Sequence, residues 1–299
     1  MYINMLSDYL KDNFGEKLYR ISLDGGMTCP NRDGTCGTRG CIFCTEDGSG
    51  EFTPHKYLSL DEQINAGKKL VENKTRSDKY IAYFQAFSNT YAPVEYLRKL
   101  YTKVIKRDDI AILSIATRPD CINDEVLCLL DELNKIKPVW VELGLQTCNE
   151  KTAVFIRRGY KNDVYEDAVA KLKDINCKVI THIIFGLPFE SKDEMIKSAK
   201  YAGRFSDGIK FHMLYVAKNT DLAKIYENIP FPMLSMDEYI DVLCNSLRVV
   251  PKETIIHRLT GDGDKKSLIA PLWSCNKKKV LREINNALID RNIVQGERL

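Results

Sequence analysis

Short apolar runs alternate along this chain with segments whose apolar residues recur every three or four positions. Six runs are rich in β-branched and aromatic residues, as strands are. They lie at residues 17–24, 80–87, 110–117, 139–146, 178–187 and 208–216. The segments between them have the spacing of amphipathic helices. These lie at residues 59–74, 92–107, 123–136, 162–175 and 191–205.

This alternation predicts an α/β fold made of βα units, with a parallel sheet and right-handed crossovers. Ser59 with Glu62, and Ser191 with Glu194, have the spacing of capping boxes, which supports helix starts at both places. A doubly wound sheet and an open or closed βα barrel both satisfy the pattern. Beyond residue 220 the alternation loosens into a β-like run at 253–263 and a lysine-rich helical segment at 276–292.

Polar residues stand at or just beyond the C-terminal ends of several predicted strands. They include Gln85, Thr117, Arg118, Gln146 and Glu190. Active sites of α/β folds collect at this edge of the sheet. We therefore expect the functional site there, whichever of the two sheet arrangements the chain adopts.

The composition is that of an ordinary globular protein. The 299 residues are 44% hydrophobic and 28% charged, which is sufficient for a sizeable core. The longest apolar runs are far shorter than the ~20 residues that cross a membrane, and the first residues lack the features of a secretory signal. Ten cysteines without an export signal favour a reducing compartment, so we expect a cytoplasmic protein without membrane partners. The net charge of +3 permits a nucleic-acid partner without demonstrating one.

The stretch "TCPNRDGTCGTRGCIFCTEDGSG" (28–50) carries Cys29, Cys36, Cys41 and Cys44 in a polar loop that has no core for small hydrophobic side chains. The CxxC formed by Cys41 and Cys44 fits a redox pair, half of a zinc site or half of an iron–sulfur site. A second CxxC or an HxxxH, which zinc would favour, does not occur, although zinc held by all four thiols stays open. The alternative is an iron–sulfur cluster held by three thiolates, which leaves one iron with an open position.

Several further motifs accompany the cysteine loop. They are "CPNRDGT.G..GC.FC", "YFQAFSNTYAP", "LSIATRPDC", "VELGLQT", "FGLPFES" and "IIHRLTGDG". Together the chain resembles the radical SAM (S-adenosylmethionine) superfamily, and more closely a bacterial family with an Elp3-like core. The resemblance implies a partial (β/α)6 TIM-like barrel over residues 1–220 and a C-terminal extension over 221–299. It also implies a [4Fe–4S] cluster and SAM as cofactors, and an electron donor such as flavodoxin or ferredoxin.

The resemblance implies that Cys29, Cys41 and Cys44 hold the cluster. The usual superfamily spacing is CxxxCxxC, whereas Cys36 gives Cx4CxxC and Cys29 gives Cx11CxxC. The closer family carries its first ligand in "CPNRDG", so we favour Cys29 and treat Cys36 as an additional thiol. Phe43, before the last ligand, is expected to offer an aromatic face to the adenine.

The same resemblance assigns residues to SAM. Glu142 is expected to bind the ribose hydroxyls, and Arg158 the SAM carboxylate, with Arg157 facing solvent. The remaining expected contacts come from Gln85, Thr117, Gln146 and the backbone turn at Gly186 and Leu187. Lys210 and His212 alternate on the sixth strand, so they share a face. If that face lines the barrel, both point at the substrate and are the candidate catalytic residues.

Shared chemistry follows from the resemblance, whereas the substrate does not. In the superfamily the reduced cluster cleaves SAM, and the 5′-deoxyadenosyl radical abstracts a hydrogen atom from the substrate. Elp3-like cores act on the wobble uridine of tRNA at C5. The Gram-positive relatives that this chain resembles remodel its carboxymethylaminomethyl group to the aminomethyl form. The alternatives are a small metabolite or a protein as substrate, or a non-enzymatic electron carrier that would not need the SAM residues.

Some basic and aromatic residues fit the tRNA hypothesis. Lys277, Lys278, Lys279 and Arg282 cluster at the start of the last predicted helix, where they are expected to contact phosphates. Tyr83, Phe87 and Tyr91 are candidates for stacking on a splayed base. Arg258, Asp262 and Asp264, in "HRLTGDGDKK", are expected to close the open side of the barrel or to contact the substrate.

Overall fold

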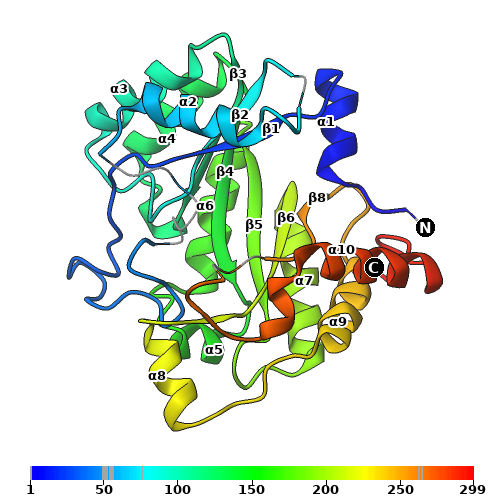
Figure 1. Ribbon diagram of the computed structural model, residues 1–299. Helices are drawn as coiled ribbons and strands as arrows, with labels where there is room; N and C mark the ends of the chain where they lie inside the picture. The colour runs from blue at the N-terminus through cyan, green and yellow to red at the C-terminus, as the bar shows by residue number, and fades with distance from the viewer. Residues whose placement is uncertain (1, 49–52, 54–56, 76, 262, 264) are drawn as a thin grey trace.

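The computed structural model is built on one sheet of seven parallel strands (Figure 1). It describes every residue except 1, 49–52, 54–56, 76, 262 and 264. In spatial order the strands are β1 (Tyr19–Leu23), β2 (Tyr80–Phe84), β3 (Ile110–Thr117), β4 (Val139–Gln146), β5 (Lys178–Phe185), β6 (Gly208–Met213) and β8 (Ile255–Arg258). The sheet curls into a half-barrel with β1 and β8 at its edges, which confirms the predicted partial barrel. The seventh strand comes from the β-like run at 253–263.

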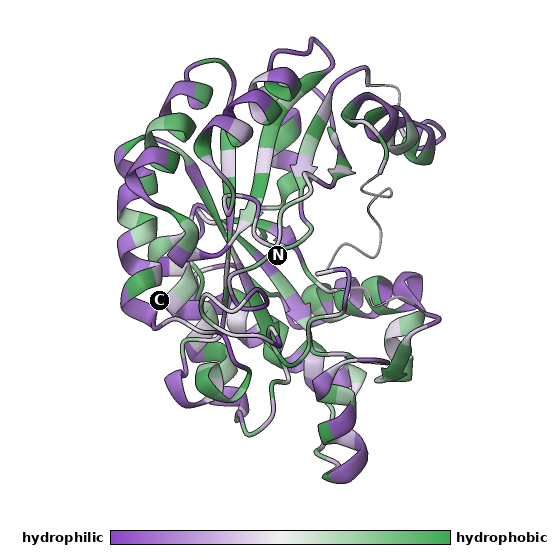
Figure 2. Ribbon diagram, turned by 90° about the vertical axis from the view of Figure 1, so that its left-hand side faces the viewer, coloured by the Kyte–Doolittle hydropathy of each residue, from purple (hydrophilic) through white to green (hydrophobic). Residues whose placement is uncertain are grey.

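Six helices lie along the outer face of the sheet. They are α2 (Leu60–Val71), α3 (Val94–Ile105), α4 (Asp124–Asn134), α6 (Asn162–Asp174), α7 (Lys192–Phe205) and α9 (Met236–Arg248). The expected capping boxes at Ser59 and Ser191 both form. Figure 2 shows hydrophilic residues on the outward sides of these helices and hydrophobic residues along the strands. Strands covered on both faces are nearly continuous apolar runs, as in β2, where all five residues are buried.

Helix α1 (Leu6–Phe14) closes the N-terminal end of the half-barrel. Its Leu6 and Leu10 pack with inward-facing residues near the starts of β2, β3, β4, β5 and β8. These are Ile81, Ile112, Trp140, Ile180 and Ile255. Full burial of a leucine such as Leu10 is worth roughly 1.5–3 kcal/mol. This apolar plug leaves only the C-terminal half of the inner face for a site.

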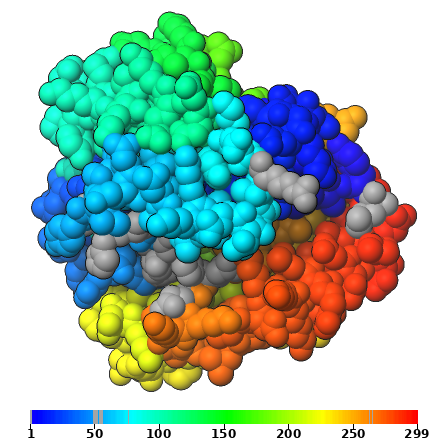
Figure 3. Space-filling view, turned by 45° about the horizontal axis from the view of Figure 1, so that its top comes forward, coloured from blue at the N-terminus to red at the C-terminus, as the bar shows by residue number. Residues whose placement is uncertain are grey.

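The C-terminal part of the chain lies across the open side of the half-barrel and beside the N-terminal segment. It contains α8 (Asp221–Asn228), η2 (Leu272–Cys275), α10 (Lys277–Asp290) and the antiparallel pair β7 (Val216–Ala217) and β9 (Leu268–Ala270). The remaining short elements are η1 (Pro119–Cys121) and α5 (Glu150–Phe155). Figure 3 shows the first residues, in dark blue, next to the last ones, in red.

Hydrogen bonds join the two chain ends to β8. The backbone N–H of Asn4 donates to Oε1 of Gln295 at 2.9 Å, and the Gln295 amide donates to the carbonyl oxygens of Pro251 and Thr254. Ile256 of β8 donates its N–H to the carbonyl oxygen of Asn4 at 2.7 Å. Residues from both chain ends therefore hold this edge strand. None of the described helices is long and apolar enough to cross a membrane.

Candidate active site

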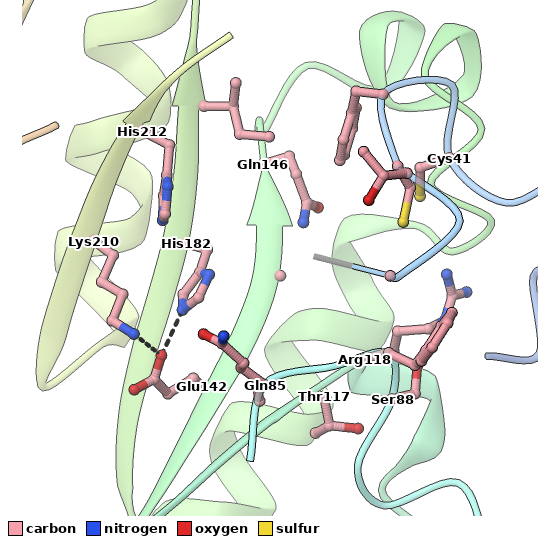
Figure 4. Close-up of a pocket in the computed structure, with 18 of the residues that line it drawn as sticks. Cys41, Gln85, Ser88, Thr117, Arg118, Glu142, Gln146, His182, Lys210 and His212 are labelled. Carbon is pink, nitrogen blue, oxygen red and sulfur yellow. Dashed lines mark hydrogen bonds and ion pairs between the residues drawn. The ribbon is translucent and has the colours of Figure 1, made fainter. Parts of the chain in front are cut away.

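A cavity of about 600 Å³ occupies the C-terminal half of the inner face. The cysteine loop forms one wall, and the strand ends from β4 to β8 form the opposite wall. Figure 4 shows Cys41 on the first wall and Glu142, His182, Lys210 and His212 on the second. The cavity thus lies at the C-terminal edge of the sheet, where the sequence predicts the functional site. The structure also decides in favour of the half-barrel over the doubly wound sheet.

The cysteine loop brings three of its four described thiols to this cavity. Cys29, Cys41 and Cys44 line it, whereas Cys36 is exposed and lines a separate depression on the outer side of the loop. Burial raises the pKa of Cys41 to about 12, and the nearby Cys44 and Cys29 add to the effect. This placement agrees with the preference for Cys29 over Cys36, and the ligand set stays a prediction.

The donor chemistry of this wall fits an iron–sulfur cluster. Cys41 Sγ accepts a hydrogen bond from the Asn31 amide at 3.6 Å, and hydrogen bonds to sulfur are one of the ways in which proteins tune such clusters. In the part of the chain that the structure describes, no three His, Cys, Asp or Glu side chains converge on a metal position. The three thiols therefore share a wall but do not form a closed ligand set.

Polar contacts hold the cysteine loop, together with Ile42, which is buried in an apolar cluster although the sequence predicts a loop without a core. The Asn31 amide also donates to the carbonyl oxygen of Arg157 at 2.6 Å, and Ile42 donates its N–H to Ile156. The Arg32 guanidinium donates to the carbonyl oxygens of Cys44 and Thr45. These bonds attach the loop to itself and to the end of α5.

The opposite wall is organised by the period of two along each strand. Register partners in a parallel sheet share a face, and Ser114 pairs with Trp140, Ala116 with Glu142, and His182 with Lys210. The inner face thus changes from the apolar plug to polar residues two positions further along several strands. The second set is Tyr83, Ser114, Glu142, His182, Lys210 and His257.

Glu142 is the centre of this polar layer. Its side chain is fully buried, and it accepts hydrogen bonds from Ser114 Oγ and His182 Nε2, each at 2.7 Å, and from Lys210 Nζ. Arg20 approaches within 3.8 Å. Burial alone would raise the pKa of Glu142, but Lys210 and His182 hold it well below its usual value. The carboxylate is therefore ionised inside the barrel.

Burial lowers the pKa values of the lysine and the three histidines around Glu142. Burial, and then the Arg20 guanidinium, lower the pKa of Lys210 to about 7. Burial also lowers the pKa of His182, and of His212 and His257 well below the usual value, so these three imidazoles are neutral. The rings of His182 and His212 lie 5.2 Å apart. Three of the four histidines in the chain line this one cavity.

Most of the residues expected to hold SAM lie on the cavity. Phe43, Gln85, Thr117, Gln146 and both candidate catalytic residues line it. Gln146 has a left-handed backbone, with φ of 61°, at the end of β4. Gly186 and Leu187 lie outside the described lining. Leu187 is buried in an apolar cluster that also contains Ile42 and Ile156. Adenine binding by this turn stays a prediction.

Glu142 and Arg158 also border the cavity, but their polar atoms are engaged within the protein. The Arg158 side chain is 1% exposed and donates to the carbonyl oxygens of Leu145, Thr147 and Tyr160. Its remaining nitrogen reaches Asn162 and Glu150. In this structure Arg158 fixes the turn after β4. The roles assigned to both residues toward SAM stay predictions.

One expectation about a neighbouring residue was wrong. Arg157 was expected to face solvent, but it is half-buried and forms an ion pair with Asp221 at 2.5 Å. Tyr91 is not among the described residues that line the cavity, and its hydroxyl lies 2.8 Å from Thr35 Oγ1; its role in base stacking stays a prediction. Tyr83 and Phe87 do line it. Asp262 and Asp264 lie outside the described residues.

Sequence reasoning missed Arg20, His182 and His257 as members of the site. Arg20 Nη2 lies 2.9 Å from His257 Nδ1, across the inner face from β1 to β8. The available signal was that residues two positions apart on a strand share a face, which we call parity. His182 stands two positions after the plug residue Ile180, just as Glu142 stands two positions after Trp140. Parity alone does not tell which face is the inner one.

Comparisons with known proteins agree with this fold and identify the family. The family described as "Radical SAM superfamily" matches residues 34–202, and the "Radical_SAM C-terminal domain" matches residues 206–290. The chain therefore belongs to the radical SAM superfamily, a class of enzymes, and membership implies SAM and a [4Fe–4S] cluster. The resemblance inferred from the motifs is confirmed.

Particular relatives extend over the whole chain. The chain is 44% identical to "Uncharacterized protein YtqA" of Bacillus subtilis, over 98% of this chain and 91% of that protein. It is 34% identical to "Protein YhcC" of Escherichia coli, over 99% and 95%. A "tRNA uridine(34) acetyltransferase" of Methanocaldococcus jannaschii is 26% identical over 50% of this chain and 28% of that protein.

Among solved structures, the chain is similar to the archaeal Elp3 of Methanocaldococcus infernus. The TM-score is 0.67 at 16% identity, and the match covers 93% of this chain and 64% of that chain. Because the identity is low, this likeness shows the fold alone. The Elp3-like half-barrel is thereby confirmed.

Glu190, in the turn after β5, supports a prediction about pH. Thr147 Oγ1 donates to its Oε1, whereas no described group is hydrogen-bonded to its buried Oε2. Burial raises the pKa of Glu190 to about 7. When the pKa of a carboxyl is higher in the folded than in the unfolded state, the free energy of unfolding of the protein falls as the pH rises from the unfolded-state pKa to the folded-state pKa, here about 7.

We therefore expect Glu190→Gln, which stays neutral, to gain stability over the wild type as pH rises from 5 to 8. The gain should be roughly 1–3 kcal/mol in the free energy of unfolding. Urea unfolding at the two pH values measures it, with the exposed Glu227→Gln on α8 as control. A parallel pH dependence of wild type and variant would contradict the burial of an acidic Glu190.

Proposed function

We propose that this enzyme modifies the wobble uridine of tRNA, converting its C5 carboxymethylaminomethyl group to the aminomethyl form. The observation that carries the proposal is the pairing of two walls in one cavity, with thiols on one side and a buried polar layer on the other. A cavity of about 600 Å³ is of the size that small-molecule sites have. The partial match to a relative named as a tRNA uridine(34) acetyltransferase supports this substrate class.

In this proposal, Cys29, Cys41 and Cys44 hold the cluster. When bound, the cluster and SAM would supply an organic radical that removes a hydrogen atom from the CH2 of the carboxymethyl group. Loss of one further electron, to an acceptor such as the oxidised cluster, would give an imine, and water would then release the two carbons as glyoxylate and leave the aminomethyl amine. The proposed SAM contacts are Phe43, Gln85, Thr117, Glu142, Gln146, Arg158, Gly186 and Leu187. Lys210 and His212 contact the substrate, and the buried plug below them excludes water from the floor of the cavity.

The start of α10 is the proposed docking site for tRNA phosphates. Lys277 lines the cavity, and Lys278 and Lys279 are exposed beside it. Lysines in the first turn of a helix oppose its dipole, which typically costs 0.3–1 kcal/mol each. Their placement is therefore unfavourable for the helix itself and favourable for binding an anion next to the cavity.

Variants at the start of α10, here called tail variants, test this docking by measured tRNA affinity. The pair Lys278→Ala and Lys279→Ala should weaken binding to every tRNA about equally, since phosphate contacts carry no sequence information. The log–log salt slope should fall by roughly 0.7–0.9 for each contact removed. Filter binding at several salt concentrations measures both. The matched control is Lys197→Ala with Lys200→Ala, two exposed lysines on α7. Wild-type affinity and slope in the tail variant would mean that α10 does not dock RNA.

The substrate itself is tested by nucleoside mass spectrometry. Total tRNA from a deletion strain should accumulate the carboxymethylaminomethyl nucleoside and lack the aminomethyl one. Anaerobic incubation of that tRNA with reconstituted enzyme, SAM and a reductant should produce the aminomethyl form. An unchanged nucleoside profile would overturn the proposal and leave a small metabolite or a protein as the substrate.

A further inference from the structure

The described residues that line the cavity contain seven arginine and lysine side chains and one carboxylate, Glu142. The basic residues are Arg20, Arg32, Arg118, Arg158, Lys210, Arg258 and Lys277. This imbalance is far greater than that of the whole chain, which has 44 basic and 41 acidic residues. A cavity lined by one sign of charge concentrates ligands of the other sign.

Two of these arginines are paired with acidic residues that do not line the cavity. Arg118 forms an ion pair with Asp120 at 2.6 Å, and Arg158 lies 3.4 Å from Glu150. The polar layer around Glu142 on the opposite wall forms the floor of the cavity. On this floor, by contrast, Arg20 and Lys210 face the same carboxylate. Lys210 pairs with one oxygen of Glu142, and Arg20 lies 3.8 Å from the other. One carboxylate cannot neutralise two cations, so the floor carries excess positive charge whenever Lys210 is protonated.

Two nitrogen atoms of the same floor lack hydrogen-bond partners among the described residues. They are Nε of Arg20 and Nε2 of His212, and both are buried. Both side chains border the cavity, and Figure 4 shows His212 above His182 on that wall. A buried polar group without a partner is unfavourable and needs an explanation. A bound ligand with acceptor oxygens supplies one.

We infer that Arg20, Lys210 and His212 form an anion subsite that binds the carboxylate of the substrate side chain. The inference rests on the proposed function, in which the modified uridine carries a carboxymethyl group. An arginine and a lysine provide charge-assisted hydrogen bonds, the strongest that proteins offer to carboxylates. The Tyr83 ring, 4.2 Å from Lys210 Nζ, holds the ammonium in place.

The same floor distinguishes substrate from product. The carboxymethylaminomethyl group ends in an anion, whereas the aminomethyl product ends in a primary amine that is protonated near neutral pH. The cationic floor attracts the first and repels the second. Binding of the substrate and release of the product therefore both follow from one arrangement of charges.

Two anticodon stem-loops test the subsite. They are identical except that one carries the carboxymethylaminomethyl group and the other its neutral carboxamide. The wild type, reconstituted anaerobically, should bind the carboxylate RNA about tenfold to a hundredfold more tightly, as expected for a charge-assisted contact. Arg20→Gln should reduce this ratio to below about threefold, by loss of that contact. Arg20→Lys, which keeps the charge, should retain most of it.

The exposed Arg204→Gln on α7 is the matched control and should keep the wild-type ratio. Iron content and unfolding temperature show whether each variant is folded. If Arg20→Gln does not fold, the same binding ratio is measured with His212→Ala. Equal binding of the two RNAs by the wild type, or an unchanged ratio in the folded variants, would overturn the subsite.

Conversion of the carboxylate RNA is followed by mass spectrometry in the same samples. Conversion together with equal affinities would overturn the subsite and leave the proposed function standing. Absence of conversion by the wild type would overturn the proposed function, and the substrate assignment of the subsite with it.

Discussion

Replacing Cys29 by alanine should abolish cluster binding, whereas replacing Cys36 should leave it intact. Cys29 shares the cavity wall with Cys41 and Cys44, while Cys36 lines the depression on the outer side of the loop. A cluster with an open iron needs three thiolates, so loss of any one removes the site. We expect about four irons per chain in the wild type and in Cys36→Ala, and close to none in Cys29→Ala.

Iron and acid-labile sulfide, measured after anaerobic reconstitution, provide the readout. Cys41→Ala and Cys44→Ala serve as positive controls for loss of the cluster, and Cys36→Ala is the matched control within the same loop. Retention of the cluster in Cys29→Ala with its loss in Cys36→Ala would reverse the ligand assignment. Zinc as the only tightly bound metal would exclude the cluster.

Replacing Glu142 by glutamine should cause the largest loss of stability in the barrel. The Glu142 side chain is fully buried and that of Lys210 is 5% exposed, so removal of the carboxylate leaves Lys210 and Arg20 without their counterion. Breaking a buried ion pair from one side typically destabilises a protein by 3–5 kcal/mol. We expect a loss of about that size in the free energy of unfolding.

Removal of both charges should be less harmful than removal of one. In Glu142→Gln combined with Lys210→Met, no ammonium is left without a counterion, so part of the lost stability should return. Urea unfolding of the two single variants and the double variant completes a double-mutant cycle, with the exposed Glu227→Gln as control. Additive effects would show that Glu142 and Lys210 do not interact in the folded protein.

The sequence predicted the order and type of the main elements because each is a local pattern. The six strands and the capped helices at Ser59 and Ser191 follow from periodicity and caps within short windows. The seventh strand was visible as a β-like run, but its four residues were not delimited. Its place beside β6 depends on a crossover through the C-terminal part of the chain, which no local pattern encodes.

The site was predictable only where one strand or one loop carries it. Lys210 and His212 share a face because they stand two positions apart, and this parity placed both on one wall. The contacts of Glu142 join β4 to β3, β5 and β6, so they depend on register and on the curl of the sheet. Arg20 reaches His257 across the half-barrel, from one edge strand to the other.

Hydrogen bonds from both chain ends hold β8, so the structure of the chain ends at the surface affects residues of β8 that line the cavity. This strand has a neighbour in the sheet on one side only, and its outer edge is covered by Asn4, which Gln295 holds in turn. Edge strands are the parts of a sheet that open most easily, and β8 carries His257 and Arg258 into the cavity. Local opening at the two ends of the chain would therefore change the dielectric environment of the buried histidines.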